Sequence, residues 1–148
     1  MSQGKPWTWG SLMSEELELA YFAGFFDGEG CIGLYWITSK KGYQPQIQLG
    51  NTNKPILKAF QARFGGIVRS CKVKPFQRPT WQWSINGGGA KIAYFLKAIL
   101  PYLRQKKEEA ETMLEYIDTI TTTTKPIPPE LQEIRKKLSE RLKELKRV

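Results

Sequence analysis

The sequence predicts an α+β fold in which helices and β-hairpins alternate in the order αββαββα, followed by C-terminal helices. Two stretches, 32–49 and 67–85, alternate apolar and polar residues on either side of a turn, as antiparallel hairpins do. Segments with apolar residues at helical spacing come before, between and after them. A chain of 148 residues can bury a sizeable core, so we expect a single domain over 1–148 with its core at 14–120.

The first helix and hairpin carry clear local signals. Ser14 is a favoured N-cap, and the helix is predicted to run from there to about Asp27. The return strand of the hairpin places Gln44, Gln46 and Gln48 on one face of the sheet. Their amides both donate and accept hydrogen bonds, which suits base edges in a major groove, although an ordinary polar sheet face has the same pattern.

The second helix and hairpin repeat these signals. Asn53 is expected to cap a helix that ends at Gly65. The hairpin that follows is expected to place Arg69 and Gln82 on the face opposite the apolar Trp83. The polar faces of the two hairpins therefore form one surface if the four strands share a sheet.

Two further helices are predicted at 90–100 and 102–120, separated by Pro101. The start of the second one carries Arg104, Lys106 and Lys107. Positive charge is unfavourable at a helix N-terminus, so this start points to a negatively charged partner.

The end of the chain is expected to form a separate helix. Residues 121–129 form a Thr- and Pro-rich linker. Residues 130–148 repeat apolar residues at helical spacing, which predicts an amphipathic helix. This helix can pack on the body or on a partner, and the sequence leaves both open.

Charge is unevenly distributed along the chain. The net charge is +9, but residues 30–107 hold fourteen Lys or Arg and no Asp or Glu. A solvated face usually mixes both signs, so a surface without acids indicates a polyanionic partner. The chain has no histidine, which excludes Ser-His and Cys-His catalysis, and its two cysteines are too few for a zinc site. We expect an intracellular protein with no membrane partner, because signal peptide and membrane span are both absent from the sequence.

Two acids stand at the predicted end of the first helix. Asp27 and Glu29 lie where helix carbonyls point, which costs roughly 0.3–1 kcal/mol per exposed charge. A bound cation would reverse this, because carboxylates and free carbonyls together form a site for a hard metal ion. Small residues at Ala20, Gly24 and Gly28 share one face of the same helix and would let a second backbone approach closely. The alternative is a buried helix that ends in a glycine cap.

The string Phe-Ala-Gly-Phe-Phe-Asp-Gly-Glu-Gly at 22–30 resembles the signature of the LAGLIDADG homing endonucleases. The predicted element order resembles the domain of that family over 14–120. The resemblance implies an antiparallel sheet that forms a DNA-binding saddle. Because the chain has one motif, it also implies a homodimer of the intron-encoded type on a near-palindromic double-stranded DNA site, paired through Ala20, Gly24 and Gly28.

The resemblance also implies roles for individual residues. Glu29 matches the metal-binding acid of the motif, with the Gly28 carbonyl as a second ligand, and Mg²⁺ suits such an oxygen site. Lys106 matches a basic residue that stabilises charge or orients water. Asn51 matches the residue that positions the attacking water, although Asn53 and Lys54 compete for that role. Asp27 matches an acid whose role we expect to be structural.

The sheet face is expected to contact DNA. The side chains expected to read bases are Tyr35, Ile37, Ser39, Gln44, Gln46, Gln48, Arg69 and Gln82. The side chains expected to bind phosphates are Lys40, Lys41, Lys72, Lys74 and Arg78. The alternatives are an RNA-binding splicing factor, that is a maturase, and a DNA-binding regulator without catalysis. An intact Glu29 with Lys106 favours the nuclease.

Overall fold

The computed structural model describes residues 14–40, 42–71, 74–76, 78–86, 89–121 and 128–146. The elements follow in the order α1 (Glu15–Glu29), β1 (Gly30–Ile37), η2 (Thr38–Lys40), β2 (Gly42–Asn51), α2 (Lys54–Phe64), β3 (Ile67–Cys71), β4 (Thr80–Asn86), α3 (Ala90–Ile99), η3 (Leu100–Tyr102), α4 (Lys107–Thr121) and α5 (Pro129–Lys146). The α+β order αββαββα is thus present, with α4 and α5 after it.

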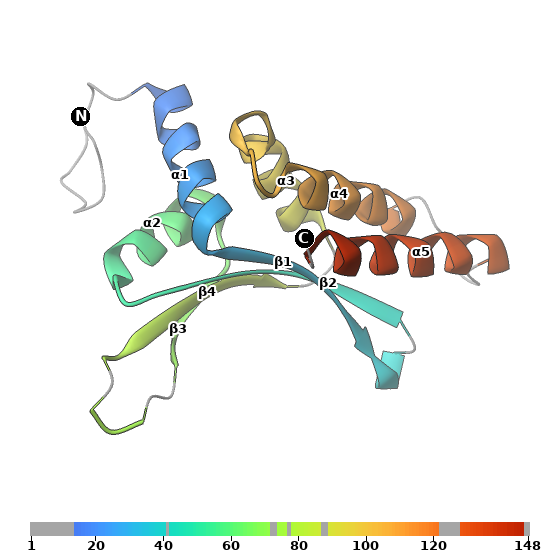
Figure 1. The fold of residues 1–148 in the computed structure, drawn as a ribbon, viewed down its shortest axis with the longest axis horizontal. Helices are drawn as coiled ribbons and strands as arrows, with labels where there is room; N and C mark the ends of the chain where they lie inside the picture. The colour runs from blue at the N-terminus through green and yellow to red at the C-terminus, as the bar shows by residue number, and fades with distance from the viewer. Residues whose placement is uncertain are drawn as a thin grey trace.

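The four strands form one antiparallel sheet in the order β1-β2-β4-β3. Ile47 of β2 pairs with Ile32 on one side and with Ile85 on the other, and all three side chains are buried. Figure 1 shows α1 to α5 on this apolar face, whereas the strands curve away from these helices at both ends. The opposite face of the described sheet is therefore a concave arch, which is the saddle that the sequence predicted.

Aromatic rings fix α1, α2 and α3 to the sheet. The Phe60 ring of α2 lies 4.7 Å from Phe22 of α1 and 5.0 Å from Trp83 of β4, measured between centroids. Phe95 of α3 lies 5.2 Å from Trp83, whose indole donates a 2.7 Å hydrogen bond to the Gly65 carbonyl. This packing sets the angle at which α1 meets the sheet, and therefore where α1 ends.

The predicted boundaries differ from the structure at two helix ends. The first helix continues to Glu29, two residues beyond the prediction. The fourth helix begins at Lys107 rather than at residue 102, because η3 and an irregular segment come first. The first turn of α4 therefore carries Glu108 and Glu109, which suit the helix dipole. Of the three basic residues expected at this helix start, Lys107 is the first residue of α4, whereas Arg104 and Lys106 precede the helix.

The C-terminal helix α5 packs on the body of the molecule, which resolves the alternative that the sequence left open. It lies against α4 and β1 (Figure 1), and its Leu142 is buried. The Arg135 side chain donates hydrogen bonds to the Thr119 hydroxyl and carbonyl of α4, at 3.1 and 2.9 Å. Most of the predicted linker, 122–127, lies outside the described residues. Among the described helices, none is both long and apolar enough to cross a membrane.

Candidate active site and nucleic-acid interface

The last turn of α1 presents Glu29 to solvent. Gly28 and Glu29 are both exposed, and β1 begins immediately after them. Among the described residues, the Glu29 carboxylate has no hydrogen-bond or ion-pair partner. The acid that the sequence assigned to the metal is therefore free to take a ligand.

On one face of α1, called the bare face below, no described residue covers Gly24 or Gly28. A side chain added at Gly24 or Gly28 would meet no atom within 4 Å in the described structure. Leu17 and Tyr21 lie on the same face at helical spacing, and they are 59% and 43% exposed. Ala20, which the sequence assigned to this face, is half-buried. Sequence reasoning missed Leu17 and Tyr21, although their spacing from Gly24 contained the signal.

Asp27, two residues before Glu29, is fully engaged. Its Oδ2 accepts hydrogen bonds from the backbone N–H groups of Arg104 at 2.8 Å and Gln105 at 3.0 Å. Its Oδ1 accepts one from the backbone N–H of Lys106 at 2.8 Å. Three consecutive amides thus surround one carboxylate, an arrangement that favours an anion.

Lys106 reaches the end of α1 as well. Its Nζ donates a 2.6 Å hydrogen bond to the backbone carbonyl of Asp27, and the side chain is half-buried. Carbonyls in the last turn of a helix carry partial negative charge, so a cation is favourable here. The Lys106 ammonium therefore lies on the carbonyl of a residue two positions before Glu29. Lys106 and Glu29 are the two residues that the family resemblance assigned to catalysis.

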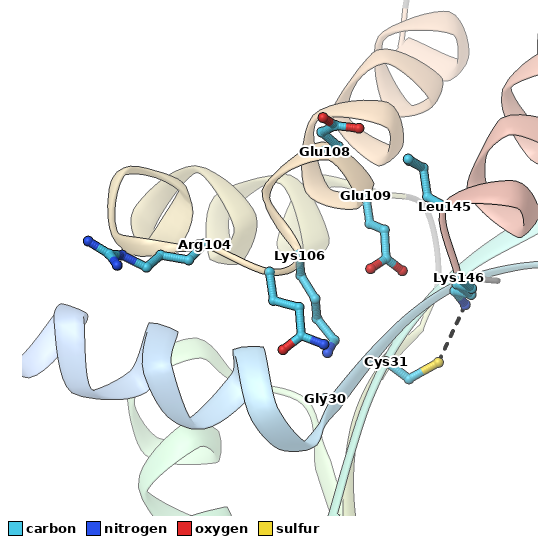
Figure 2. A pocket seen from close by; sticks show the side chains of 9 residues that line it. Gly30, Cys31, Arg104, Lys106, Glu108, Glu109, Leu145 and Lys146 are labelled. Carbon is cyan, nitrogen blue, oxygen red and sulfur yellow. Dashed lines mark hydrogen bonds between the residues drawn. The ribbon is translucent and has the colours of Figure 1, made fainter. Parts of the chain in front are cut away.

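A cavity of about 480 Å³ opens beside Lys106, between the start of β1, the segment before α4 and the end of α5. In Figure 2 the Glu109 side chain hangs from α4 into the space between Lys106 and Lys146, whereas Glu108 points away. Burial raises the pKa of Glu109, and the positive charges of Lys106 and Lys146 oppose that rise. The Lys146 ammonium lies 3.5 Å from the Cys31 sulfur. Sequence reasoning missed both acid and lysine: Glu109 lies in the first turn of α4, three residues after Lys106, whereas Lys146 reaches the cavity only because α5 returns to the body.

The donor set for a metal ion is incomplete in one chain. Among the described residues, no group of three or more His, Cys, Asp or Glu side chains is arranged to hold a metal. Both carboxylate oxygens of Asp27 are occupied, which leaves the Glu29 carboxylate and the Gly28 carbonyl. Mg²⁺ binds through one or two carboxylates and keeps several waters, so two copies of Glu29 facing one phosphate group fit its chemistry.

The three candidates for positioning a water have local partners. Asn51 is the last residue of the central strand β2, two positions beyond Leu49, which pairs with Gly30 where α1 ends and β1 begins. Its Oδ1 accepts a hydrogen bond from the backbone of Asn53 at 2.8 Å. Asn53 caps α2, and the Lys54 ammonium lies 4.2 Å from the centroid of the Trp81 ring. Of the three, Asn51 is the one that lies on the sheet.

The predicted base-reading residues share the concave face. Tyr35 pairs with Gln44 and Arg69 pairs with Gln82, on the side away from the helices. Gln48 donates its Nε2 to the Oε1 of Gln46 at 2.8 Å, so these two amides are aligned side by side. Ile37 and Ser39 stand at the far end of β1, at its junction with η2. Asn86, which sequence reasoning missed, pairs with Gln46 and lines the same hollow as Tyr35 and Gln44.

Two of the predicted phosphate-binding side chains belong to the described part of the chain. Lys74 and Arg78 are exposed in the connection between β3 and β4. Lys41 and Lys72 lie outside the described residues, as does the side chain of Lys40. Figure 1 shows that both hairpins extend downwards from the centre of the sheet, on the two sides of the concave face.

The model of the LAGLIDADG endonuclease family matches residues 22–123, which is more than half of the chain. The chain belongs to the LAGLIDADG endonuclease family. The match begins in the apolar part of α1 and includes Asp27, Glu29 and Lys106. Among curated proteins, none matches the sequence significantly.

Solved homing endonucleases share the fold. I-CvuI in complex with its target superposes with a TM-score of 0.72 and 24% identity, covering 88% of this chain and 83% of that one. The archaeal intron-encoded I-Vdi141I in complex with DNA gives 0.73 and 16%, covering 89% and 86%. I-GzeII in complex with its DNA target gives 0.67 and 15%, covering 82% of this LAGLIDADG chain but 43% of that one. This chain is therefore about as long as I-CvuI and about half as long as I-GzeII.

Proposed function

We propose that this LAGLIDADG protein is a homing endonuclease that acts as a homodimer and cuts both strands of a long, near-palindromic DNA site. The observation that carries the proposal is the end of α1, where the Glu29 carboxylate is exposed and the Lys106 ammonium is held on the carbonyl of Asp27, two positions earlier in the same helix. The same molecule presents a concave sheet face without acids. The family and the DNA-bound relatives support this function.

The homodimer is supported by length and by shape. The chain covers less than half of I-GzeII, so one copy of this fold accounts for about half of such a chain. The bare face of α1, from Leu17 through Gly24 to Gly28, is suited to a second α1 from another copy. Two-fold pairing would place both Glu29 carboxylates at the centre of the dimer and would continue the two concave sheets into one surface.

Divalent metal binding follows from that pairing. Glu29 and the Gly28 carbonyl of each copy would hold Mg²⁺, which neutralises the repulsion between the two carboxylates. When bound, the ion supplies charge stabilisation at the attacking and leaving oxygens of a phosphodiester. Lys106 contributes a fixed positive charge next to the scissile phosphate. Asn51 offers its side-chain amide at the end of β2 to orient a water.

Sequence recognition is assigned to the concave face. The aligned amides of Gln46 and Gln48, together with Gln44, Gln82, Tyr35 and Arg69, reach base edges in the major groove. Lys74 and Arg78 bind phosphates at the flanks, with Lys40, Lys41 and Lys72 as further candidates. The alternative of an RNA partner has no support from these relatives, whose nucleic acid is DNA. A regulator without catalysis has no need for an exposed Glu29 and a lysine ammonium held at the end of the same helix.

A cleavage selection from a randomised DNA library in Mg²⁺ tests the proposal, with wild type compared to Glu29→Gln. We expect wild type to cut one long, near-palindromic site. Glu29→Gln should bind that site with unchanged affinity but cut it at least about 100-fold more slowly, because the metal ligand is lost. Absence of any cutting by wild type, or full activity of Glu29→Gln, would contradict the proposal.

A further inference from the structure

We propose that Asp27 is a positioning residue, which holds Lys106 at the end of α1 through both the backbone and the side chain of the lysine. This inference rests on the proposed function, because it takes Lys106 to act on the DNA phosphate. It assigns different roles to two acids that stand two positions apart. The Glu29 carboxylate is free to bind a ligand, whereas Asp27 holds Lys106 in position.

The backbone contact is a three-amide cradle. The Asp27 carboxylate receives the N–H groups of Arg104, Gln105 and Lys106 at 2.8, 3.0 and 2.8 Å. These residues lie between η3 and α4, where neither helix supplies acceptors for their amides. Without Asp27, three consecutive donors lose their acceptor, so the path of this segment depends on the carboxylate.

The contact also explains why an acid is tolerated at the end of α1. The Lys106 carbonyl accepts the first hydrogen bond of α4, from Ala110 at 2.9 Å, so Lys106 is the N-cap of that helix. The Asp27 carboxylate therefore lies at the N-terminus of α4, where the helix dipole favours negative charge. The unfavourable end of one helix is the favourable end of the other.

The side-chain contact closes the arrangement. The Lys106 ammonium donates to the Asp27 carbonyl at 2.6 Å, so a single residue of α1 holds both ends of the lysine. An ammonium group has three protons, and this bond uses one of them. The other two can reach a phosphate oxygen without any rearrangement of the four-carbon side chain. Because flexible lysines lose rotamer freedom when they bind, fixing the chain beforehand favours the reaction.

Asp27→Asn removes this cradle with little change of shape. The amide has a single oxygen, and its NH₂ group faces N–H donors that it cannot accept. We expect single-turnover cleavage to slow by about 10- to 100-fold, as is typical when a supporting hydrogen bond behind a functional group is lost. Affinity for the target measured without cleavage should change by less than about twofold. Glu115→Gln, which removes an exposed acid from α4, is the matched control and should cleave like wild type.

A double-mutant cycle separates positioning from general stability. If Asp27 acts through Lys106, Asp27→Asn should add nothing in a Lys106→Met background, because the group that it positions is gone. A purely structural role would lower the rate by the same factor in both backgrounds. That additivity, or an Asp27→Asn enzyme as fast as wild type, would overturn the inference.

Hydrogen exchange of backbone amides tests the inference in the wild-type protein alone, so the result does not depend on whether a variant folds. Residues 104–106 lie outside any helix, yet their amides should exchange far more slowly than those of an open loop, because they are bonded to Asp27. Exchange at loop rates would refute the cradle even if the protein cuts DNA. Protected amides in a protein that cuts no DNA would instead count against the proposed function and leave the cradle in place.

Discussion

The ionised form of Glu109 is made less favourable by the surroundings of its side chain in the folded protein. Burial raises its pKa, and the nearby Asp27 carboxylate acts in the same direction, whereas Lys106 and Lys146 oppose both. Because the net shift is upwards, the ionised form of Glu109 is less favourable in the folded protein than in the unfolded chain. Because Glu109 is only half-buried, the resulting loss of folding stability is small, but its direction can be tested.

Glu109→Gln is expected to raise the melting temperature at neutral pH. An acid with a raised folded-state pKa stabilises the fold below its unfolded pKa, and this contribution is lost as pH rises through the folded pKa. The advantage of the variant over wild type should therefore shrink as pH falls through the raised pKa of Glu109, and it should be absent below 4.5, the ordinary value for the group. Thermal unfolding over a pH series measures this difference, with Glu111→Gln, an exposed acid of the same helix, as the charge control. An advantage that stays constant down to acid pH would contradict the assignment.

The sequence located both acids of α1 but could not separate their roles by local rules. Asp27 and Glu29 have the same charge, a similar size and glycine neighbours. What separates them is a segment 77 to 79 positions further along, whose amides reach Asp27 and not Glu29. Contacts over such a separation are set by how α1 and α3 pack, which periodicity does not encode. The resemblance to the family supplied the assignment that local reasoning left open.

At the scale of elements, α5 illustrates both what a pattern predicts and what it omits. Its apolar spacing predicted a helix near 130–148, and the structure has one at Pro129–Lys146. Within the predicted stripe, however, Leu142 is 2% exposed and Ile134 is 47% exposed. Spacing identifies a face of the helix but not how far along the helix its partner extends. The body covers the C-terminal half of α5, next to β1 and the cavity.

Two alanine substitutions on α5 test this difference. Leu142→Ala should destabilise the fold by about 2–5 kcal/mol, because it leaves a cavity among buried side chains. Ile134→Ala, on the same stripe and of similar size, should change stability by less than about 1 kcal/mol. Denaturant unfolding measures both, and the slope of the transition should be unchanged if the native state keeps its compactness. Equal losses at the two positions would mean that α5 is buried along its whole length.

In the whole molecule, a single helix–strand junction connects the end of α1, with Glu29, to the concave face of the sheet. Glu29 ends α1, and Gly30 begins β1 directly after it, so the acid that we propose for catalysis and the concave sheet are covalent neighbours. The alternation of the two hairpins predicted which residues share that face. The curvature of the sheet, and the strand order that places β4 between β2 and β3, depend on packing between distant segments. Those features could be expected only from the family resemblance.

The bare face of α1 gives a prediction for the assembly as a whole. If two copies pair through this face, wild type should sediment at twice the chain mass of 17.0 kDa. Gly24→Leu should sediment as a monomer, because its side chain would occupy the space that the second helix needs. The variant should still fold, since that position has no atom within 4 Å and leucine favours a helix by up to about 1 kcal/mol over glycine.

Circular dichroism checks the fold of Gly24→Leu, and loss of double-strand cleavage should accompany loss of the dimer, because one chain holds only one Glu29. Lys97→Leu, which adds the same side chain at an exposed site of α3, should remain dimeric and active. A Gly24→Leu protein that keeps the doubled mass would place the dimer interface elsewhere. The two Glu29 carboxylates would then have no reason to meet, and the shared metal site would have to be abandoned along with the α1 pairing.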